Sequence, residues 1–338
     1  NLSISFTPTS WFNGLSEDIN DSDVLEEDER FHASWDYAAG NFYYSLNYNP
    51  SNFYDLFGPT KRSRKGISGG IDYSASLIWD PPISLSLDLG IAGFYGLDKS
   101  PEFQTLATTG YDDNLFLDFY GALSYSFIKN SIGAVEDEKG FSGSLQGGTA
   151  ITEGKLYPNL VGNADFGIPL IIKHTSLWIR SAVGRSFSNT YNPFTRFGFA
   201  AFGNNYVDSY QPKQFRDIYS LPGLTYNDDK YIESQDFGKI MTEVILPPIR
   251  YKKLGFFNLF ANWTQASIFA SALVSRDYDQ EYDESYIDKF VNIGAQIDTR
   301  VVLFSLLPST FSIGFARAYD INDTQMSYDE FMISLKIL

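Results

Sequence analysis

The sequence feature that most constrains the fold is a run of alternating side chains at 67–80, which reads ISGGIDYSASLIWD. Ile67, Ile71, Leu77 and Trp79 lie at one set of alternate positions, and the other set is mostly Ser, Gly and Asp. Because successive side chains of a β-strand point to opposite faces, this run predicts a strand with one apolar and one polar face. Its length exceeds the roughly 5–6 residues that are usual in soluble domains.

The same alternation recurs along the chain after a sharp Pro-Pro turn at 81–82. It is clear at 83–96, 115–127 and 331–337, where Leu, Ile and aromatic residues alternate with small or polar ones. The pattern predicts about fourteen strands, and up to sixteen. The predicted strands cover 2–11, 30–38, 41–49, 66–80, 83–97, 113–128, 140–152, 159–168, 174–188, 235–247, 254–276, 288–303, 309–319 and 329–338.

The connections between these segments alternate in length. Short connections, often with Pro, are predicted at 39–40, 81–82, 169–173, 248–253 and 304–308, together with a longer one at 129–139. Long polar connections are predicted at 12–29, 50–65, 98–112, 189–234, 277–287 and 320–328, together with a modest one at 153–158. Short turns at one end of the strands and long loops at the other are typical of a bacterial outer-membrane barrel.

Composition is consistent with that architecture. Although 43% of the residues are hydrophobic, the chain has no apolar run of about 18 residues that would predict a membrane-spanning helix. Aromatic residues make up 17% of the chain, and several, such as Trp79, Tyr95 and Trp178, lie near predicted strand ends, where interfacial girdles occur. A soluble sandwich, propeller or lipocalin-like barrel is the alternative, but its strands would be shorter and its second face would carry large apolar residues.

We therefore predict one all-β domain over 1–338, a transmembrane antiparallel up-and-down β-barrel in the bacterial outer membrane. Closing the sheet would remove the exposed edges that cannot lie in lipid. Outer-membrane lipids and lipopolysaccharide are the expected surroundings. The acidic loop segments 16–30 and 277–288 lack the spacing of an EF-hand, and we expect them to face divalent ions at that surface.

The residue types present exclude several classes of function. A net charge of −16 disfavours nucleic acid as a partner, because phosphate binding needs a basic face. Cysteine is absent and histidine occurs twice, at His32 and His174, so we expect no metal and no cofactor. His174 precedes Thr175 and Ser176, but adjacent strand residues point to opposite faces and no nucleophile motif is present. We expect no enzyme and no catalytic residue.

The segment 189–234 contains NPFTRFGFAAFGNN and KQFRDIYSLPG, and the following strand reads MTEVILPP. In this order these motifs resemble the C-terminal barrel of the Omp85 superfamily, the bacterial surface antigens. The sixth extracellular loop of that family opens with a Pro-Phe-x-x-Phe-x-x-Gly-Gly-like run and carries a (Val/Leu)-Arg-Gly-(Phe/Tyr) tip. The residues that match are Pro193, Phe194, Phe197 and Gly203 in the loop opening, Phe215, Arg216, Asp217 and Ile218 at the tip, and Glu243 and Pro247 in the strand.

The resemblance extends over most of the chain and is best from about 113 to the end. The segment 292–320 resembles the penultimate hairpin of the family. The sequence departs from the family pattern at Asp217, which replaces the tip glycine, at Ser271, where relatives usually have Asp, and at Leu338, where an aromatic residue is usual. Fourteen strands is fewer than the sixteen of the family, and the polypeptide-docking repeats of the family are not in this sequence.

The resemblance and the strand pattern together define a candidate latch. If the loop 189–234 folds into the lumen, Arg216 can form a bidentate ion pair with a carboxylate of the barrel wall. Glu243 shares a predicted strand face with Lys239, so it should point inward, and Phe215 and Asp217 flank the arginine. The alternative is an ordinary surface arginine and a Glu243 that pairs with Lys239.

The resemblance implies a function in the insertion, assembly or translocation of protein or lipid, with the latched loop as a gate. It also implies a seam between the first and last strands that could open toward lipid. Two other functions stay open: a passive or gated pore for small solutes, and a membrane anchor for a periplasmic domain or partner complex. Periplasmic or membrane proteins would be partners in some of these cases.

Overall fold

A computed structural model of the protein describes the following residues: 2–6, 31–49, 66–95, 115–152, 154–187, 197–199, 202, 213–224, 232–256, 258–279, 284–304, 306–322 and 327–337. Antiparallel strands account for most of this part of the chain. Within it, no helix is both long enough and apolar enough to cross a membrane.

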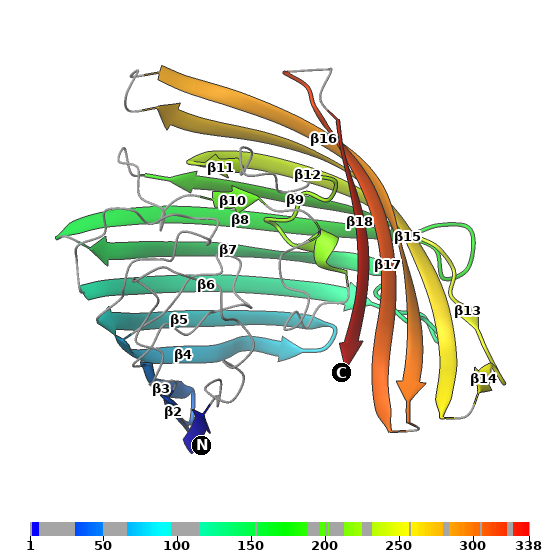
Figure 1. Ribbon diagram of the computed structural model, residues 1–338, viewed down its shortest axis with the longest axis horizontal. Coiled ribbons are helices and arrows are strands. Elements are labelled where there is room, and N and C mark those ends of the chain that lie inside the picture. The colour runs from blue at the N-terminus through cyan, green and yellow to red at the C-terminus, as the bar shows by residue number, and fades with distance from the viewer. Residues whose placement is uncertain are drawn as a thin grey trace, which may run out of the picture. The chain divides into compact units, whose positions relative to one another are not determined.

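The strands follow one another in the sheet in the order in which they occur in the chain (Figure 1). Their bounds are β1 Leu2–Phe6, β2 Phe31–Ala39, β3 Phe42–Asn49, β4 Gly66–Asp80, β5 Ile83–Tyr95, β6 Leu115–Lys129, β7 Lys139–Thr152, β8 Lys155–Pro169, β9 Ser176–Ser186, β12 Asp236–Ile245, β15 Leu259–Asp279, β16 Glu284–Leu303, β17 Leu307–Asp320 and β18 Ser327–Ile337. The short strands β13 (Ile249–Arg250) and β14 (Gly255–Phe256) pair with β15 beside this path. The prediction of an all-β, antiparallel, up-and-down sheet is confirmed.

The two ends of the sheet order are β1 and β18. Among the described residues no pairing joins these two strands, so the sheet is not closed and the barrel stays a proposal. Contacts along the chain define two compact units. The first comprises Asn1–Ala75, Leu87–Gly121 and Gly148–Tyr157, and the second comprises Ser76–Ser86, Ala122–Gly147 and Pro158–Leu338.

The first unit holds β1 to β3 and parts of the strands that follow. Hydrogen bonds between its strands involve tyrosines and aspartates. The hydroxyl of Tyr43 on β3 donates to Asp36 on the neighbouring β2 over 2.6 Å, and that of Tyr120 on β6 donates across β5 to Asp72 on β4 over 2.7 Å. The prediction of a single domain stays a prediction, because the boundaries between the units cut through strands rather than through a linker.

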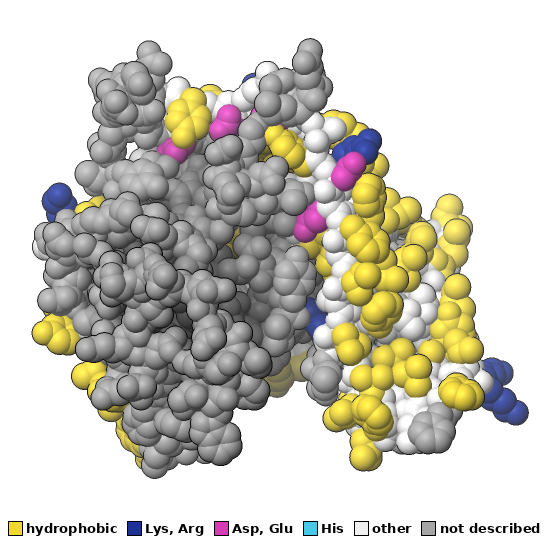
Figure 2. All heavy atoms as spheres, in the orientation of Figure 1, with side chains coloured by type: hydrophobic (Ala, Val, Ile, Leu, Met, Phe, Trp, Pro, Cys, Tyr) yellow, Lys and Arg dark blue, Asp and Glu magenta, His cyan; other side chains and the backbone are white. Residues whose placement is uncertain are grey.

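The second unit has polar residues on its buried face and apolar residues on its exposed face. On β17, Ser312 is fully buried while Phe315 is 49% exposed. On β18, Ser334 and Lys336 are buried while Phe331 is 63% exposed. The unit also buries aromatic and aliphatic clusters, so its buried face is mixed, whereas its exposed face carries many large apolar side chains. Figure 2 shows this hydrophobic surface where Figure 1 places β15 to β18.

Several strand boundaries differ from those predicted, among them the following three. Strand β9 begins at Ser176 rather than 174, because His174 has a φ of 62° and ends a tight turn. Strands β15 and β16 extend to Asp279 and from Glu284, so most of the loop predicted at 277–287 is strand. Asp277 lies opposite Tyr286 in the pairing of these two strands, and the hydroxyl of Tyr286 donates to it over 2.9 Å.

The long loop predicted at 189–234 contains structure of its own. Its described part forms a two-stranded sheet of β10 (Phe197–Phe199) and β11 (Ile232–Ser234), and the 3-10 turn η3 (Gln214–Arg216). The site described next is built on η3 and the residues around it, and it lies entirely in the second unit.

Candidate functional site: an ion-paired loop on the polar face of the sheet

The loop segment 213–224 folds as consecutive turns. Backbone hydrogen bonds join Arg216 to Lys213, Ser220 to Asp217 and Leu224 to Leu221. The carboxylate of Asp217 accepts from the backbone N–H of Tyr219 over 2.8 Å, which is the local hydrogen bond that makes Asp favourable in turns. The residue that replaces the glycine of the family motif therefore stabilises the turn after the arginine.

Arg216 and Glu243 form a bidentate ion pair. Nε of Arg216 lies 2.9 Å from Oε2 of Glu243, and Nη2 lies 2.6 Å from Oε1. The side chain of Glu243 is fully buried on β12. Two parallel charge-assisted hydrogen bonds fix the geometry as well as the charge.

A second arginine binds the same carboxylate. Arg180 on β9 donates through Nη2 to Oε2 of Glu243 over 3.1 Å, and through Nη1 to Asp165 on β8 over 2.6 Å. Strands β8, β9 and β12 are neighbours in the sheet, so these side chains meet on one face of it. Glu243 therefore links the loop segment to three strands.

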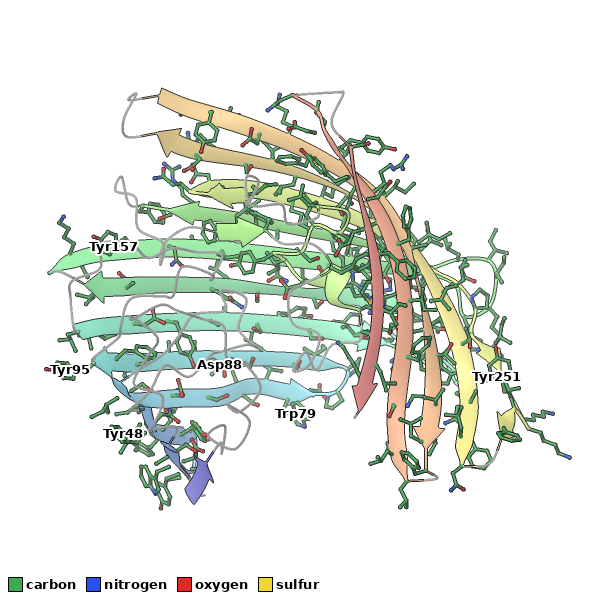
Figure 3. All side chains as sticks on the ribbon, viewed as in Figure 1. Tyr48, Trp79, Asp88, Tyr95, Tyr157 and Tyr251 are labelled. Atoms are coloured by element: carbon green, nitrogen blue, oxygen red, sulfur yellow. The ribbon has the colours of Figure 1, made fainter. Side chains whose placement is uncertain are left out.

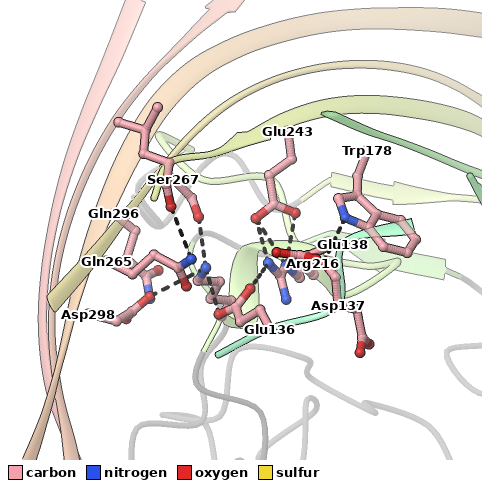
Figure 4. Close-up of polar contacts among 12 residues, drawn as sticks. Glu136, Asp137, Glu138, Trp178, Arg216, Glu243, Gln265, Ser267, Gln296 and Asp298 are labelled. Atoms are coloured by element: carbon pink, nitrogen blue, oxygen red, sulfur yellow. Dashed lines mark hydrogen bonds and ion pairs between the residues drawn. The ribbon is translucent and has the colours of Figure 1, made fainter. Parts of the chain in front are cut away.

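The turn between β6 and β7 supplies another carboxylate. Glu136 lies 2.6 Å from Nη2 of Arg216 and 2.7 Å from Nζ of Lys213. Burial alone would raise the pKa of Glu136, but the positive charges of Arg216 and Lys213 outweigh burial and hold this pKa below its usual value. Burial would likewise lower the pKa of Arg216, but Glu243 and Glu136 raise it, so the arginine stays charged. Figure 4 shows Arg216 between Glu136 and Glu243.

Lys213 extends the network to β15 and β16. Its ammonium group is 99% buried, donates to Oγ of Ser267 over 2.7 Å, and lies 3.8 Å from Oδ2 of Asp298. The other oxygen of Asp298 accepts from Gln296 and Ser312, each over 2.6 Å. A buried lysine of this kind is favourable only when its charge is compensated, and Glu136 and Asp298 provide the compensation.

Lys239 on β12 binds the backbone of the loop segment through its side chain. Its ammonium group donates to the carbonyl oxygens of Asp217, over 2.7 Å, and of Ile218 and Ser220. Lys239, Met241 and Glu243 are buried on β12 while Ile240 is half exposed, so these side chains have the predicted orientation. The alternative in which Lys239 neutralises Glu243 is wrong, because Arg216 and Arg180 bind that carboxylate.

Aromatic rings pack the loop against β15. Phe215 is fully buried and stacks on Phe269, with ring centroids 4.3 Å apart and planes 12° apart. Phe202 meets the same ring edge-on at 6.1 Å. Gly294 on β16 lies opposite Phe269, and a Cβ at this position would overlap the ring, so the stack requires glycine there.

The last strand also binds the loop. The carboxylate of Glu330 on β18 accepts from the backbone N–H groups of Phe202, over 3.0 Å, and Gly223, over 2.8 Å. Asn292 on β16 donates to the carbonyl oxygen of Pro222 over 2.7 Å and accepts from the backbone and hydroxyl of Ser271. Ser271, which departs from the family pattern, thus orients a side chain that contacts the loop.

A small cavity lies beside the ion pair. Its volume is about 50 Å³, and Asp165, Arg180, Arg216 and Lys239 are among the residues that line it. A polar cavity of this size has room for one or two water molecules.

The predicted latch residues Arg216, Glu243, Phe215 and Asp217 are close together in the structure. Phe197 is buried on β10 and packs edge-on against Phe237, with ring centroids 5.0 Å apart. The predicted loop residues Pro193, Phe194 and Gly203 lie outside the described residues.

Several residues of the site were missed by the sequence analysis, namely Glu136, Asp165, Arg180, Lys213, Asn292, Asp298 and Glu330. One signal was available for Glu136: the connection 129–139 is longer than the other short turns and carries three consecutive acids. Lys213 lies in the loop segment itself, and the remaining residues alternate on strands like any polar residue, so their pairing depends on where the loop lies.

Of the two histidines, the structure describes the side chain of His174. Nδ1 of His174 lies 2.8 Å from Glu138, and this contact joins two neighbouring turns. The side chain of His32 lies outside the described residues. Among the residues that the structure describes, no group of three or more His, Cys, Asp or Glu is placed to hold a metal ion.

Comparison of the sequence with protein-family models and with curated proteins gives no match. The Omp85 resemblance therefore rests on the residues quoted above.

Proposed function

We propose that the protein is a bacterial outer-membrane β-barrel of the Omp85 type, with the loop segment 213–224 occupying its lumen. In this proposal the loop gates the insertion, assembly or translocation of protein or lipid at the outer membrane. The main support is the reversed pattern of the second unit, in which serines, glutamines and lysines are buried while the opposite side chains are Ile, Leu and Phe. A lipid solvent makes so many exposed apolar side chains favourable, and this supports the proposal.

The contacts of the loop favour a gated structure over an open pore. Three basic side chains (Arg180, Lys213 and Arg216) and four carboxylates (Glu136, Asp165, Glu243 and Asp298) join the loop to the wall. A lumen that merely narrows around passing solutes needs no such network. Because each partner of a buried pair is costly to remove alone, the network holds the loop in one position.

Glu330 connects this gate to the proposed seam. It lies on β18, one end of the sheet order, and binds two backbone N–H groups of the loop. A loop that binds the last strand would restrain that strand when it exchanges partners. The seam would then open only after the loop has moved.

The first test is insertion. The unfolded full chain is diluted into phospholipid vesicles, and folding is followed by heat-dependent mobility on a gel and by protease resistance. We expect a folded, protease-resistant form that needs vesicles or detergent. A chain that folds and stays monomeric in plain buffer would exclude the membrane barrel.

The second test separates the functions. An unfolded small outer-membrane barrel is added to vesicles with and without the folded protein, and the folding rate of the added barrel is measured. Acceleration supports a role in assembly. Steady conductance without acceleration supports the pore, and neither effect supports the anchor.

A further inference from the structure

Three turns at one end of the second unit share a composition that the latch does not explain. They are the connections 170–175, 246–258 and 304–306. Ile245 at the end of β12 lies opposite Ser176 on β9 and Ser267 on β15. Leu303 at the end of β16 lies opposite Leu259 on β15 and Leu307 on β17. All three turns therefore lie at the same end of the strands, and we call their described residues the turn surface.

The turn surface exposes large apolar side chains. Ile171, Ile172, Ile249, Phe256, Phe304 and Leu306 each have more than three-fifths of their area exposed, and Ile171 and Phe256 are exposed over 105% and 85% of their reference areas. Turns that face water are normally built from polar residues, glycine and proline. A cluster of exposed aliphatic and aromatic side chains marks an interaction surface.

The same turns are strictly basic. They carry Lys173, Arg250, Lys252 and Lys253, all exposed, and contain no Asp or Glu, in a chain whose net charge is −16. Figure 2 shows basic side chains beside hydrophobic ones at the lower right, where Figure 1 places β13 and β14.

The turn 246–258 is held in place by its own contacts. The hydroxyl of Tyr251 donates to Thr264 on β15 over 3.1 Å, and Arg250 donates to the carbonyl oxygen of Gly133 in the neighbouring turn. Figure 3 shows Tyr251 at this turn, between β13 and β14. Lys252, Lys253 and Phe256 are thus presented from a fixed backbone.

Acidic residues in the adjacent turn do not cancel this charge. Glu136 is bound to Arg216 and Lys213, and Glu138 is bound to His174. Asp137 accepts a hydrogen bond from Asn130 over 2.9 Å. The neutral Asn130 leaves the negative charge of Asp137 in place, but the four exposed basic side chains still outnumber this one carboxylate and leave the region positive.

We propose that the turn surface binds the headgroups of anionic phospholipids. Its apolar tips enter the boundary between headgroups and acyl chains, and its lysines extend to the phosphates. An exposed apolar cluster whose own turns carry only basic charges fits a lipid surface of negative charge. An acidic protein would match the lysines but not the dispersed aliphatic tips. This inference rests on the proposed membrane location and adds the lipid class.

The experiment uses the full chain in detergent, titrated with phosphatidylglycerol or with phosphatidylcholine, and counts bound lipids by native mass spectrometry. We expect phosphatidylglycerol to bind more tightly than phosphatidylcholine. The variant K173Q/K252Q/K253Q should bind phosphatidylglycerol about a hundred-fold more weakly, from roughly 1 kcal/mol for each lysine near an anionic surface. Added salt should reduce the preference of the wild-type chain.

A matched control removes three positive charges from the opposite ends of the strands. Lys155 is the first residue of β8, Arg185 lies near the far end of β9, and Lys289 lies near the start of β16, and all three are exposed. K155Q/R185Q/K289Q should keep the preference for phosphatidylglycerol. Equal loss in both triple variants, or equal binding of the two lipids by the wild-type chain, would overturn the proposal.

The insertion assay keeps this result separate from the proposed function. If the chain folds into vesicles but shows no preference for phosphatidylglycerol, the lipid inference fails and the barrel proposal stands. If the chain folds in buffer without inserting, the barrel proposal fails. Flotation then decides the lipid inference: it stands if the chain floats with phosphatidylglycerol vesicles through these lysines, and fails otherwise.

Discussion

Arg216 and Glu243 are 27 residues apart in the sequence, and their side chains meet through two hydrogen bonds on the polar face of the sheet. The arginine comes from a turn of the loop and the glutamate from the strand that follows the loop. The ion pair therefore closes the loop onto the wall. Arg180 and Glu136 on either side make the pair part of a network.

The first prediction concerns the strength of this pair. Arg216→Gln should lower the free energy of unfolding by about 3–5 kcal/mol, because it leaves the buried carboxylates of Glu243 and Glu136 short of positive charge. The double variant R216M/E243M should lose less than the sum of the two single variants. Urea titration of the folded protein in detergent micelles measures these differences.

The control for this prediction is Arg317→Gln. Arg317 forms a comparable arginine–carboxylate pair with Asp329, but on the exposed face between β17 and β18. Arg317 lies three residues before the end of β17 and Asp329 two residues after the start of β18, where the strands of the proposed barrel meet water, and pairs exposed to water contribute little to stability. Equal losses of unfolding free energy in R216Q and R317Q would show that the Arg216–Glu243 pair stabilises the fold no more than an exposed pair does.

The second prediction concerns the hydrogen bonds from Lys239 to the backbone of the loop segment. Lys239→Met should release three carbonyl oxygens and expose the segment to trypsin, which cleaves after Lys213 and Arg216. Hydrogen bonds from a charged donor contribute about 1.5–3 kcal/mol each, so even one lost bond predicts at least a ten-fold faster cleavage. Mass spectrometry of timed digests identifies the cut sites.

Lys253→Met serves as the control for the digest, because Lys253 is exposed in the turn 246–258 and is not among the residues that contact the loop segment. Its loop cleavage rate should equal that of the wild-type protein. The account of Lys239 is wrong if K239M and K253M are cut in the loop at the same rate.

The third prediction concerns the aromatic stack. Gly294→Ala should cost about 1–3 kcal/mol of stability, because the added methyl group overlaps the ring of Phe269 and displaces it from Phe215. Phe269→Leu in the same chain should restore part of the loss by removing the overlap. Thermal unfolding followed by near-ultraviolet circular dichroism reports on both variants.

Gly238→Ala provides the comparison for that substitution. Gly238 lies on β12, and no atom lies within 4 Å of the position its Cβ would occupy. The same change should therefore have little effect there. A similar loss at both glycines would mean that strand conformation, rather than the Phe269 ring, causes the loss.

The fourth prediction concerns acid pH. Because the pKa of Glu136 is below its ordinary value of 4.5 in the folded protein, the unfolded chain binds this proton more readily. The stabilisation is fully present above that ordinary value and is lost as the pH falls through the lowered pKa. Urea midpoints measured between neutral pH and acid should fall over that range, and less steeply in E136Q.

Glu138 offers an internal comparison. Burial acts to raise its pKa, but hydrogen bonds from Ser131 and His174 outweigh burial and lower it, so it contributes in the same direction. E138Q should remove the pH-dependent stabilisation that comes from Glu138 and leave the stabilisation that comes from Glu136. If E136Q has the same pH dependence as the wild-type protein, the contact of Glu136 with Arg216 does not stabilise the fold.

The strand order could be predicted from the sequence because the signal is local. A period of two assigns every side chain of a strand to a face, and long strands such as 66–80 repeat that signal many times. The same rule placed Glu243 on the buried face beside Lys239. The arginine of the loop followed from the motif around Arg216.

The rest of the site could not be predicted because it depends on contacts between distant segments. Glu136 lies in a turn and Arg180 on a strand, and nothing in their neighbourhood indicates that both approach one loop. In one of the two alternatives drawn from the sequence, Lys239 would balance the carboxylate of Glu243, whereas in the structure it binds the backbone of the loop. Which ion pairs form in the network depends on the position of the loop segment 213–224 against the sheet.

The most direct test of the central claim is the conductance of the protein in a planar lipid bilayer. A membrane barrel whose lumen is closed by the loop predicts a low, flickering conductance for the wild-type protein and for R317Q, and a higher conductance for R216Q and K239M. A steady wild-type conductance that R216Q leaves unchanged would contradict the latch. No conductance in any variant would contradict the claim that the loop is what closes the lumen.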